Sequence, residues 1–150
     1  MVETLTKEVP GERIEIAMDV WTKPFWEAGK QGRLVFPRCG NCGHFRMPPT
    51  CFCPECTSQK IDWMEHSGNG VLYSYTIITR SPFPGEVPNF LYAPSIVEFP
   101  DAGKVRLIGN LVGVAVKDIQ IGMPVKTIWN SIIDGWKVPL FVSADLNQSK

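Results

Sequence analysis

Residues 39–56 read CGNCGHFRMPPTCFCPEC, and this stretch decides the fold of the 150-residue chain. Two C-x-x-C pairs are separated by ten residues, which is the pattern of two metal-binding turns. Four sulfur ligands satisfy a tetrahedral zinc ion and leave no position for water, so the pattern favours a structural site over a catalytic one. The predicted ligands are Cys39, Cys42, Cys53 and Cys56.

Other uses of these cysteines have weaker support. A redox C-x-x-C pair is expected within a thioredoxin-like βαβ pattern, which this sequence lacks. An iron–sulfur cluster also takes four cysteines, and the sequence leaves that alternative open. Replacing Cys53 by Cys51 would lengthen one turn to C-x4-C, so we interpret Cys51 as a free thiol. His44 is a poorer candidate ligand than the four thiols.

Composition excludes several classes of protein. Fifteen basic and fifteen acidic side chains cancel, so no overall field attracts nucleic acid or an anionic membrane. No stretch approaches the roughly 20 apolar residues that span a bilayer, and residues 1–10 lack the apolar run of a secretory leader. With the cysteines interpreted as metal ligands instead of disulfides, these features predict a cytoplasmic protein.

The chain divides into four predicted parts: an arm over residues 1–18, a helix and ribbon over 19–66, a barrel over 67–145 and a tail over 146–150. Aromatic residues at near-helical spacing predict a short helix ending near residue 30. Thr22 is its expected N-cap, and Gly29 is expected near its C-terminal end.

Period-two patterns and turn signals predict a mainly β fold. Gly109 interrupts an apolar strand, which predicts a bulge or sharp bend of the kind that closes a barrel. The expected architecture is a short N-terminal helix, a rubredoxin-like zinc ribbon and a five-stranded OB-fold barrel. The expected ribbon strands are 32–36 and 61–65, the barrel strands are about 71–79, 91–99, 104–114, 125–133 and 136–142, and a proline-rich loop occupies 80–88.

The sequence carries no self-sufficient catalytic constellation: it has no G-x-S-x-G elbow, no glycine-rich phosphate loop and no H-E-x-x-H. A zinc ribbon beside an OB barrel could also bind single-stranded nucleic acid, which is the competing class. Against it, residues 71–79 contain no Lys or Arg. Tyr73 and Tyr75 also share a face with Val71, which we interpret as barrel interior.

The order of these parts resembles the zinc-ribbon/OB-fold family of small proteins that accompany thiolase-fold enzymes, formerly a domain of unknown function. The likeness runs from Asp19 to Phe141. It rests on DVWTKPFWEAGKQGRLVFPRC (19–39), the two C-x-x-C pairs, SGNGVLYSYT (67–76) and IGMPVK (121–126).

The resemblance implies a non-catalytic small subunit of a hetero-oligomer, with the catalytic residues on the partner chain. The implied partner is a thiolase or retro-aldolase that cleaves a C–C bond of a CoA thioester in a degradation pathway. A ketosynthase-like acyltransferase or a hydroxymethylglutaryl-CoA synthase is the alternative partner. The small subunit would stabilise the partner and help to bind or channel the acyl-CoA.

The resemblance also assigns one structural Zn²⁺ per chain to the same four cysteines, and it implies no membrane contact. Where the chain touches CoA, the positive segment is expected to meet the phosphates, and the 80–88 loop the acyl entrance. The expected phosphate contacts are Arg33, Arg38 and Arg46. The expected partner interface is Trp21, Phe25, Trp26 and Phe83.

Overall fold

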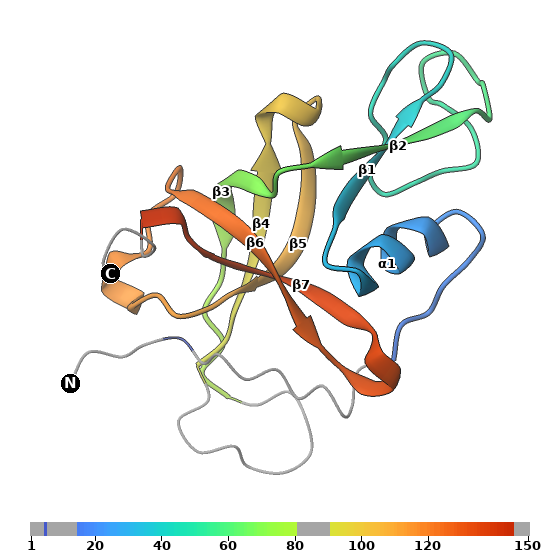
Figure 1. Cartoon of the computed structure of the whole chain (residues 1–150). Coiled ribbons are helices and arrows are strands. Elements are labelled where there is room, and N and C mark those ends of the chain that lie inside the picture. The colour runs from blue at the N-terminus through green and yellow to red at the C-terminus, as the bar shows by residue number, and fades with distance from the viewer. Residues whose placement is uncertain (1–4, 6–14, 81–90, 146–150) are drawn as a thin grey trace.

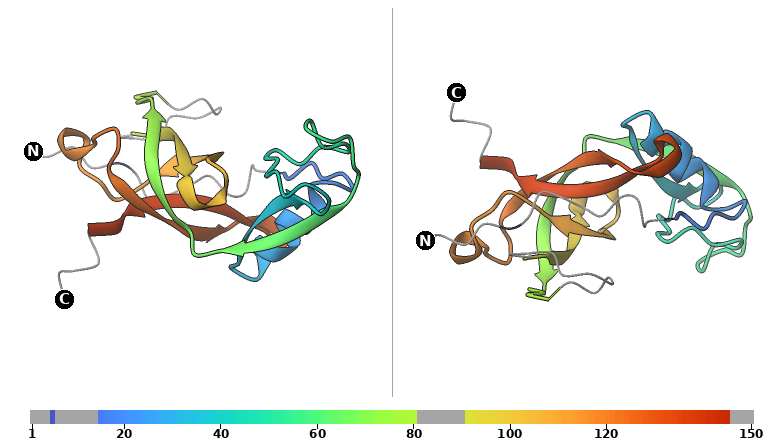
Figure 2. Two further views of the ribbon diagram at one scale, coloured as in Figure 1. Left: turned by 90° about the horizontal axis from the view of Figure 1, so that it is seen from above. Right: turned by 90° about the horizontal axis from the view of Figure 1, so that it is seen from below.

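The computed structural model describes Leu5, residues 15–80 and residues 91–145, and it has two lobes (Figures 1 and 2). One lobe is a helix beside a two-stranded ribbon, and the other is a closed barrel. The first lobe contains α1 (Lys23–Lys30), β1 (Leu34–Cys39) and β2 (Ile61–His66). The barrel contains β3 (Asn69–Tyr75), β4 (Ala93–Phe99), η2 (Pro100–Ala102), β5 (Val105–Leu111), η3 (Val116–Asp118), β6 (Pro124–Ser131), η4 (Ile133–Gly135) and β7 (Lys137–Ser143).

The barrel strands close in the order β3-β4-β5-β7-β6. Neighbours are antiparallel except β5 and β7, which run parallel. This is the predicted five-stranded OB-type barrel, and the mainly β fold class is confirmed. Apolar side chains fill its interior, and those that are almost fully buried include Leu72, Val97, Phe99, Leu111 and Phe141.

Gly109 lies in β5 where β7 comes closest. A Cβ atom on Gly109 would stand 2.8 Å from Cε2 of Phe141 and 2.9 Å from the carbonyl oxygen of Pro139. The β4–β5 ladder keeps its register through this residue and pairs it with Ser95, so the predicted bulge does not occur between these strands. The glycine instead permits the close approach of β5 and β7 that closes the barrel.

The prediction that Tyr73 faces the barrel interior is wrong. Leu72, at 1 % exposure, is the residue of β3 that points inward, so the alternation of side chains along the strand places its neighbour Tyr73 on the outer face. The register of the β3–β4 ladder then shifts between Leu72 and Ser74. Tyr73 is 46 % exposed, and its ring lies beneath the guanidinium of Arg106, with 3.6 Å between Cζ and the ring centroid. Tyr75 does pack against the core.

The helix forms where predicted and Thr22 precedes it as its N-cap residue, but Gly29 does not end it. Thr22 occupies the N-cap position without a side-chain capping bond; its N–H and hydroxyl donate to Oδ1 of Asp19, which also accepts the N–H of Trp21. Gly29 lies inside α1, where a Cβ atom would collide with the ring of Trp129. The glycine therefore sets the packing of α1 on the barrel instead of ending the helix.

The ribbon meets the barrel at His66, the last residue of β2. Its ring packs against Phe36 of β1 and Phe99 of β4, with centroids 5.3 and 5.2 Å away. Nδ1 accepts the N–H of Gly68 at 3.0 Å, so Nε2 carries the proton and donates to Oδ1 of Asp101 at 2.8 Å. This hydrogen bond lowers the pKa of the Asp101 carboxyl below its ordinary value.

Two expected features lie outside the described residues: Phe83 and nearly all of the 80–88 loop. The Asp134–Gly135 turn is described, and both residues have positive φ (+59° and +71°) between β6 and β7. Among the described residues, no helix has the length and apolar character that crossing a membrane requires.

Gly109→Ala should destabilise the chain by about 1–3 kcal/mol, because the new methyl group overlaps Phe141 and the Pro139 backbone. Urea unfolding measures the change. Ile108→Ala is the matched control, since Ile108 is 71 % exposed on the same strand and should change stability by less than about 0.5 kcal/mol. Equal stability of the two variants would contradict the close approach of β5 and β7.

Asp101→Asn should reduce the loss of stability in acid. Because the folded state lowers the pKa of Asp101, its contribution is complete above the unfolded pKa and declines as pH falls through the folded pKa. Urea midpoints measured between neutral pH and the acid range should fall further for the natural chain than for the variant. Asp118→Asn, at an exposed position in η3, should behave like the natural chain. Parallel curves for Asp101→Asn and the natural chain would refute this account of the junction.

Candidate metal centre

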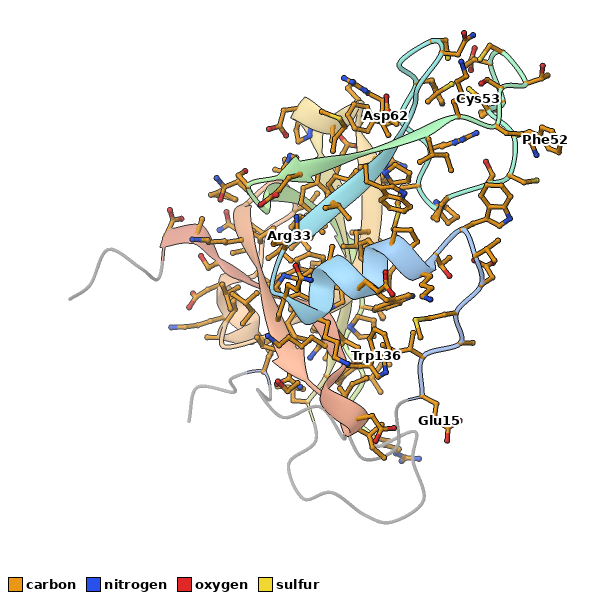
Figure 3. All side chains as sticks on the ribbon, turned by 45° about the vertical axis from the view of Figure 1, so that its right-hand side comes forward. Glu15, Arg33, Phe52, Cys53, Asp62 and Trp136 are labelled. Atoms are coloured by element: carbon orange, nitrogen blue, oxygen red, sulfur yellow. The ribbon has the colours of Figure 1, made fainter. Side chains whose placement is uncertain are left out.

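The four predicted ligands lie on two turns with matching hydrogen bonds at the tip of the ribbon (Figure 3, near Cys53). In the first turn the N–H of Gly43 donates to the carbonyl of Cys39, and in the second the N–H of Thr57 donates to the carbonyl of Cys53, each at 2.9 Å. Gly43 and Thr57 both have positive φ, +78° and +60°. The sequence indicated this freedom for Gly43 but not for Thr57, because threonine rarely adopts it.

The four sulfurs point toward one another, and all lie within 4.8 Å. The sulfur–sulfur distance is 3.6 Å for Cys39–Cys56 and for Cys42–Cys53. A tetrahedral ion with bonds of about 2.3 Å places its sulfurs about 3.8 Å apart, so the arrangement fits such an ion. Cys51 is not in this group, and its thiol is half-buried.

The pKa values of the clustered thiols differ, because backbone N–H groups and neighbouring sulfurs act on them unequally. Backbone N–H groups of Cys42 and Asn41 are directed at the sulfur of Cys39 and lower its pKa to about 6. A backbone hydrogen bond from His44 lowers the pKa of the Cys42 thiol. Desolvation and the three neighbouring sulfurs outweigh it, and together they raise the pKa of Cys42 to about 12. Four thiolates this close require a cation to coexist, and a divalent metal supplies that charge.

Comparison with known proteins assigns the same two parts to one family. Residues 26–62 match the family model "ChsH2, rubredoxin-like zinc ribbon domain", and residues 63–130 match "ChsH2, C-terminal OB-fold domain". A chain of the solved structure "Ltp2-ChsH2(DUF35) aldolase" is 36% identical, with a TM-score of 0.78 over 87% of this chain and 99% of that one. The chain belongs to the DUF35 family.

Curated relatives of this DUF35 chain differ in length. A "DUF35 domain-containing scaffold protein" of Pyrococcus furiosus is 30% identical over 67% of this chain and 71% of its own. A "Probable enoyl-CoA hydratase alpha subunit" of Thermomonospora curvata is 41% identical over 78% of this chain but 36% of its own length. The chain therefore spans about a third of that longer relative.

Arg46 has a different role in this DUF35 chain from the expected phosphate contact. It is 4 % exposed, and its guanidinium donates to the carbonyls of Ser58, Gln59 and Lys60 at 3.2 to 3.4 Å. The buried side chain thereby braces the segment that follows the second cysteine turn. Both terminal nitrogens donate to these carbonyls, and Nε is buried without a hydrogen-bond partner among the described residues. The guanidinium is therefore enclosed by the ribbon, which corrects the expectation that it meets a phosphate.

Arg33 immediately precedes β1, whereas Arg38 lies near the other end of that strand, where it pairs with Phe45. Arg33 pairs with Glu65 at 3.3 Å and with Gln31. Arg38 is half-buried, and its Nε has no hydrogen-bond partner among the described residues. A phosphate contact by Arg33 or Arg38 stays a prediction.

The predicted interface aromatics of the DUF35 helix are not equivalent. Phe25 is 3 % exposed and packs on Trp129, with ring centroids 6.1 Å apart, so it belongs to the core instead of an outer surface. Trp21 and Trp26 are half-exposed and can still meet a partner. Sequence periodicity identified the helix but could not distinguish its inner from its outer aromatics.

Cys42→Ser should reduce the metal content from about one ion per chain to nearly none, because three thiols and a hydroxyl hold the ion poorly. The measurement is elemental analysis of protein purified without chelator, together with proteolysis of the 39–58 segment, which should become rapid. Cys51→Ser is the matched control and should retain the ion. Loss of metal from Cys51→Ser, with retention by Cys42→Ser, would show that the ligand set is wrong.

Proposed function

We propose that this chain is a small accessory subunit of a hetero-oligomeric enzyme that acts on a CoA thioester, and that the partner chain carries the catalytic residues. The observation that carries the proposal is the likeness to a chain of the "Ltp2-ChsH2(DUF35) aldolase" over 99% of that chain's length. Two relatives are named an "alpha subunit" and a "scaffold protein", and both names agree with a chain that works within a protein complex.

The metal is proposed to be Zn²⁺ with a structural role. Four thiolates complete its coordination and leave no site for a substrate or water. When bound, the ion supplies a cross-link between the two cysteine turns. The chain's own residues then hold the ribbon: Arg46 secures the 58–60 carbonyls, and the β1–β2 ladder leads from Cys39 to His66 at the barrel.

Neither histidine of this chain is placed to act as a catalytic base, which agrees with catalytic residues on the partner chain. His66 is the one histidine that pairs with a carboxylate among the described residues, and both of its ring nitrogens are engaged, by Gly68 and Asp101. A general base needs a free nitrogen within reach of the substrate, which His66 does not offer. His44 is exposed beside the ribbon, outside any nucleophile–base arrangement among the described side chains.

The proposed partner is a thiolase-fold enzyme, and the proposed reaction is thiolytic or retro-aldol cleavage of a C–C bond in an acyl-CoA. This finer assignment rests on the resemblance of the sequence motifs. The competing nucleic-acid role loses support from one contact: Arg106 covers the ring of Tyr73 and pairs with Glu98 at 2.9 Å. The exposed aromatic ring is thus occupied by an intramolecular cation instead of being open to a base.

Co-expression with the thiolase-fold subunits of the same organism should give a stoichiometric complex, and its C–C cleavage activity should fall at least about tenfold when this chain is omitted. Size-exclusion chromatography measures the complex, and chromatographic quantification of the shortened acyl-CoA product measures the cleavage activity. This chain alone should have no turnover, and elemental analysis of the complex should find zinc instead of iron. Turnover by the isolated chain, or failure of every such subunit to associate, would refute the proposal.

A further inference from the structure

The barrel is paired along only part of the boundary between β5 and β7. The β4–β5 and β6–β7 ladders each contain seven residue pairs, whereas the β5–β7 ladder contains two, Asn110–Leu140 and Leu111–Phe141. Toward the N-terminal ends of these parallel strands the pairing stops. Among the described residues, the first part of β5, from Val105 to Ile108, therefore has β4 on one side and no strand on the other, and we call this side the free edge.

Pro139 ends the ladder. Backbone groups of alternate residues point to opposite neighbours, and Val112 donates its N–H to the carbonyl of Phe141 at 2.9 Å. By this alternation Ile108 and Arg106 direct their N–H and carbonyl groups toward the β7 side. Pro139 has no N–H to offer them, and the β5–β7 pairing does not reach them. At every second residue, the free edge thus presents backbone donors and acceptors that no ladder pairs within the described part of the chain.

This edge opens into an apolar groove of about 540 Å³. Phe25, Trp26 and the Pro48–Pro49 segment form one wall, and β5 and β7 form the other. Asn110 lies in the groove at 1 % exposure; its Oδ1 accepts the N–H of Ala93, but its Nδ2 has no partner among the described residues. Such an unpaired N–H is a costly feature in a buried position, and it lies beside the apolar wall of the groove.

The groove continues past Met47 and Pro48 into a second hollow, between the 44–54 loop and the β4–β5 turn. The described residues that line the two hollows include the cations Arg46, Lys104 and Arg106 but no Asp or Glu. Arg106 is paired with Glu98, whereas Lys104 forms no ion pair with any described residue. The charge at this end therefore complements an acidic group.

We propose that an extended segment of the partner subunit adds to the free edge of β5 in this groove. Its backbone hydrogen-bonds with Ile108 and Arg106, an apolar side chain lies against the half-exposed Trp26, and an acidic residue faces Lys104. Alternating backbone donors and acceptors favour a polypeptide over an acyl chain, which has no N–H groups to match them. The inference rests on the proposed function, because it requires a partner protein.

Amide hydrogen exchange followed residue by residue, in the isolated chain and in the purified complex, tests the inference. The amides of Ile108 and Arg106 should exchange rapidly in the isolated chain and at least about tenfold more slowly in the complex. The amides of Leu107 and Gly109 point toward β4, so they should be protected in both samples and serve as the internal control.

Each other outcome overturns the inference in a distinguishable way. A complex that forms while Ile108 stays unprotected refutes the edge site and leaves the accessory role intact. Protection in the isolated chain means that this chain covers its own edge, and protection by acyl-CoA alone means that the occupant is a small molecule. Failure of any complex to form refutes the proposed function together with the inference.

A pair of variants gives an independent readout. Ile108→Pro removes the N–H on the free edge without removing a β4–β5 hydrogen bond, so it should weaken association at least about tenfold. Ile108→Thr keeps that N–H and should stay within about threefold of the natural chain. Thermal melting verifies folding, and should Ile108→Pro fail to fold, Lys104→Glu provides the same test through charge reversal. Unchanged association of the folded Ile108→Pro variant, or of Lys104→Glu, would overturn the inference.

Discussion

The mutual approach of four cysteine sulfurs is the constraint on which the remaining structure depends. Cys39 is both a metal-site residue and the last residue of β1, and its ladder partner is Ile61 at the start of β2. Fixing this end fixes the register of the ladder as far as Leu34 and His66. The register in turn places the His66 ring on Phe99 of the barrel. A site at the tip of one lobe therefore determines how that lobe joins the other.

The fold of each lobe follows from contacts among its own residues, whereas residues of both lobes form the groove between them. The helix packs on the barrel through Gly29 and Trp129, and the 44–54 loop faces the β4–β5 turn across a hollow. The walls of the main groove thus come from α1, the ribbon loop and two barrel strands. A protein that binds there contacts at least four separate parts of the sequence at once. This arrangement suits a scaffold role better than an enclosed catalytic pocket.

Local signals account for what the sequence predicted well. The spacing of the cysteine pairs identified the metal centre, and the Asp134–Gly135 turn together with period-two runs identified the barrel. The errors concern contacts between distant residues. The sequence does not show that the carbonyls of residues 58–60 bury the Arg46 guanidinium. It also does not show which of the two alternating faces of β3 points inward: the core takes Leu72, and Tyr73 lies outside. The His66–Asp101 contact and the groove likewise join segments that are far apart in sequence, so no local sequence pattern predicts them.

The connection between β2 and β3 has a mechanical consequence. Ser67 and Gly68 alone separate the two strands, and the Gly68 carbonyl accepts both the N–H and the hydroxyl of Thr127, at 2.8 and 3.0 Å. A two-residue connection that is hydrogen-bonded to β6 in this way restricts rotation of the ribbon relative to the barrel. A partner that binds the cysteine turns is therefore held at a fixed distance and orientation relative to the barrel, because the ribbon continues directly into β3.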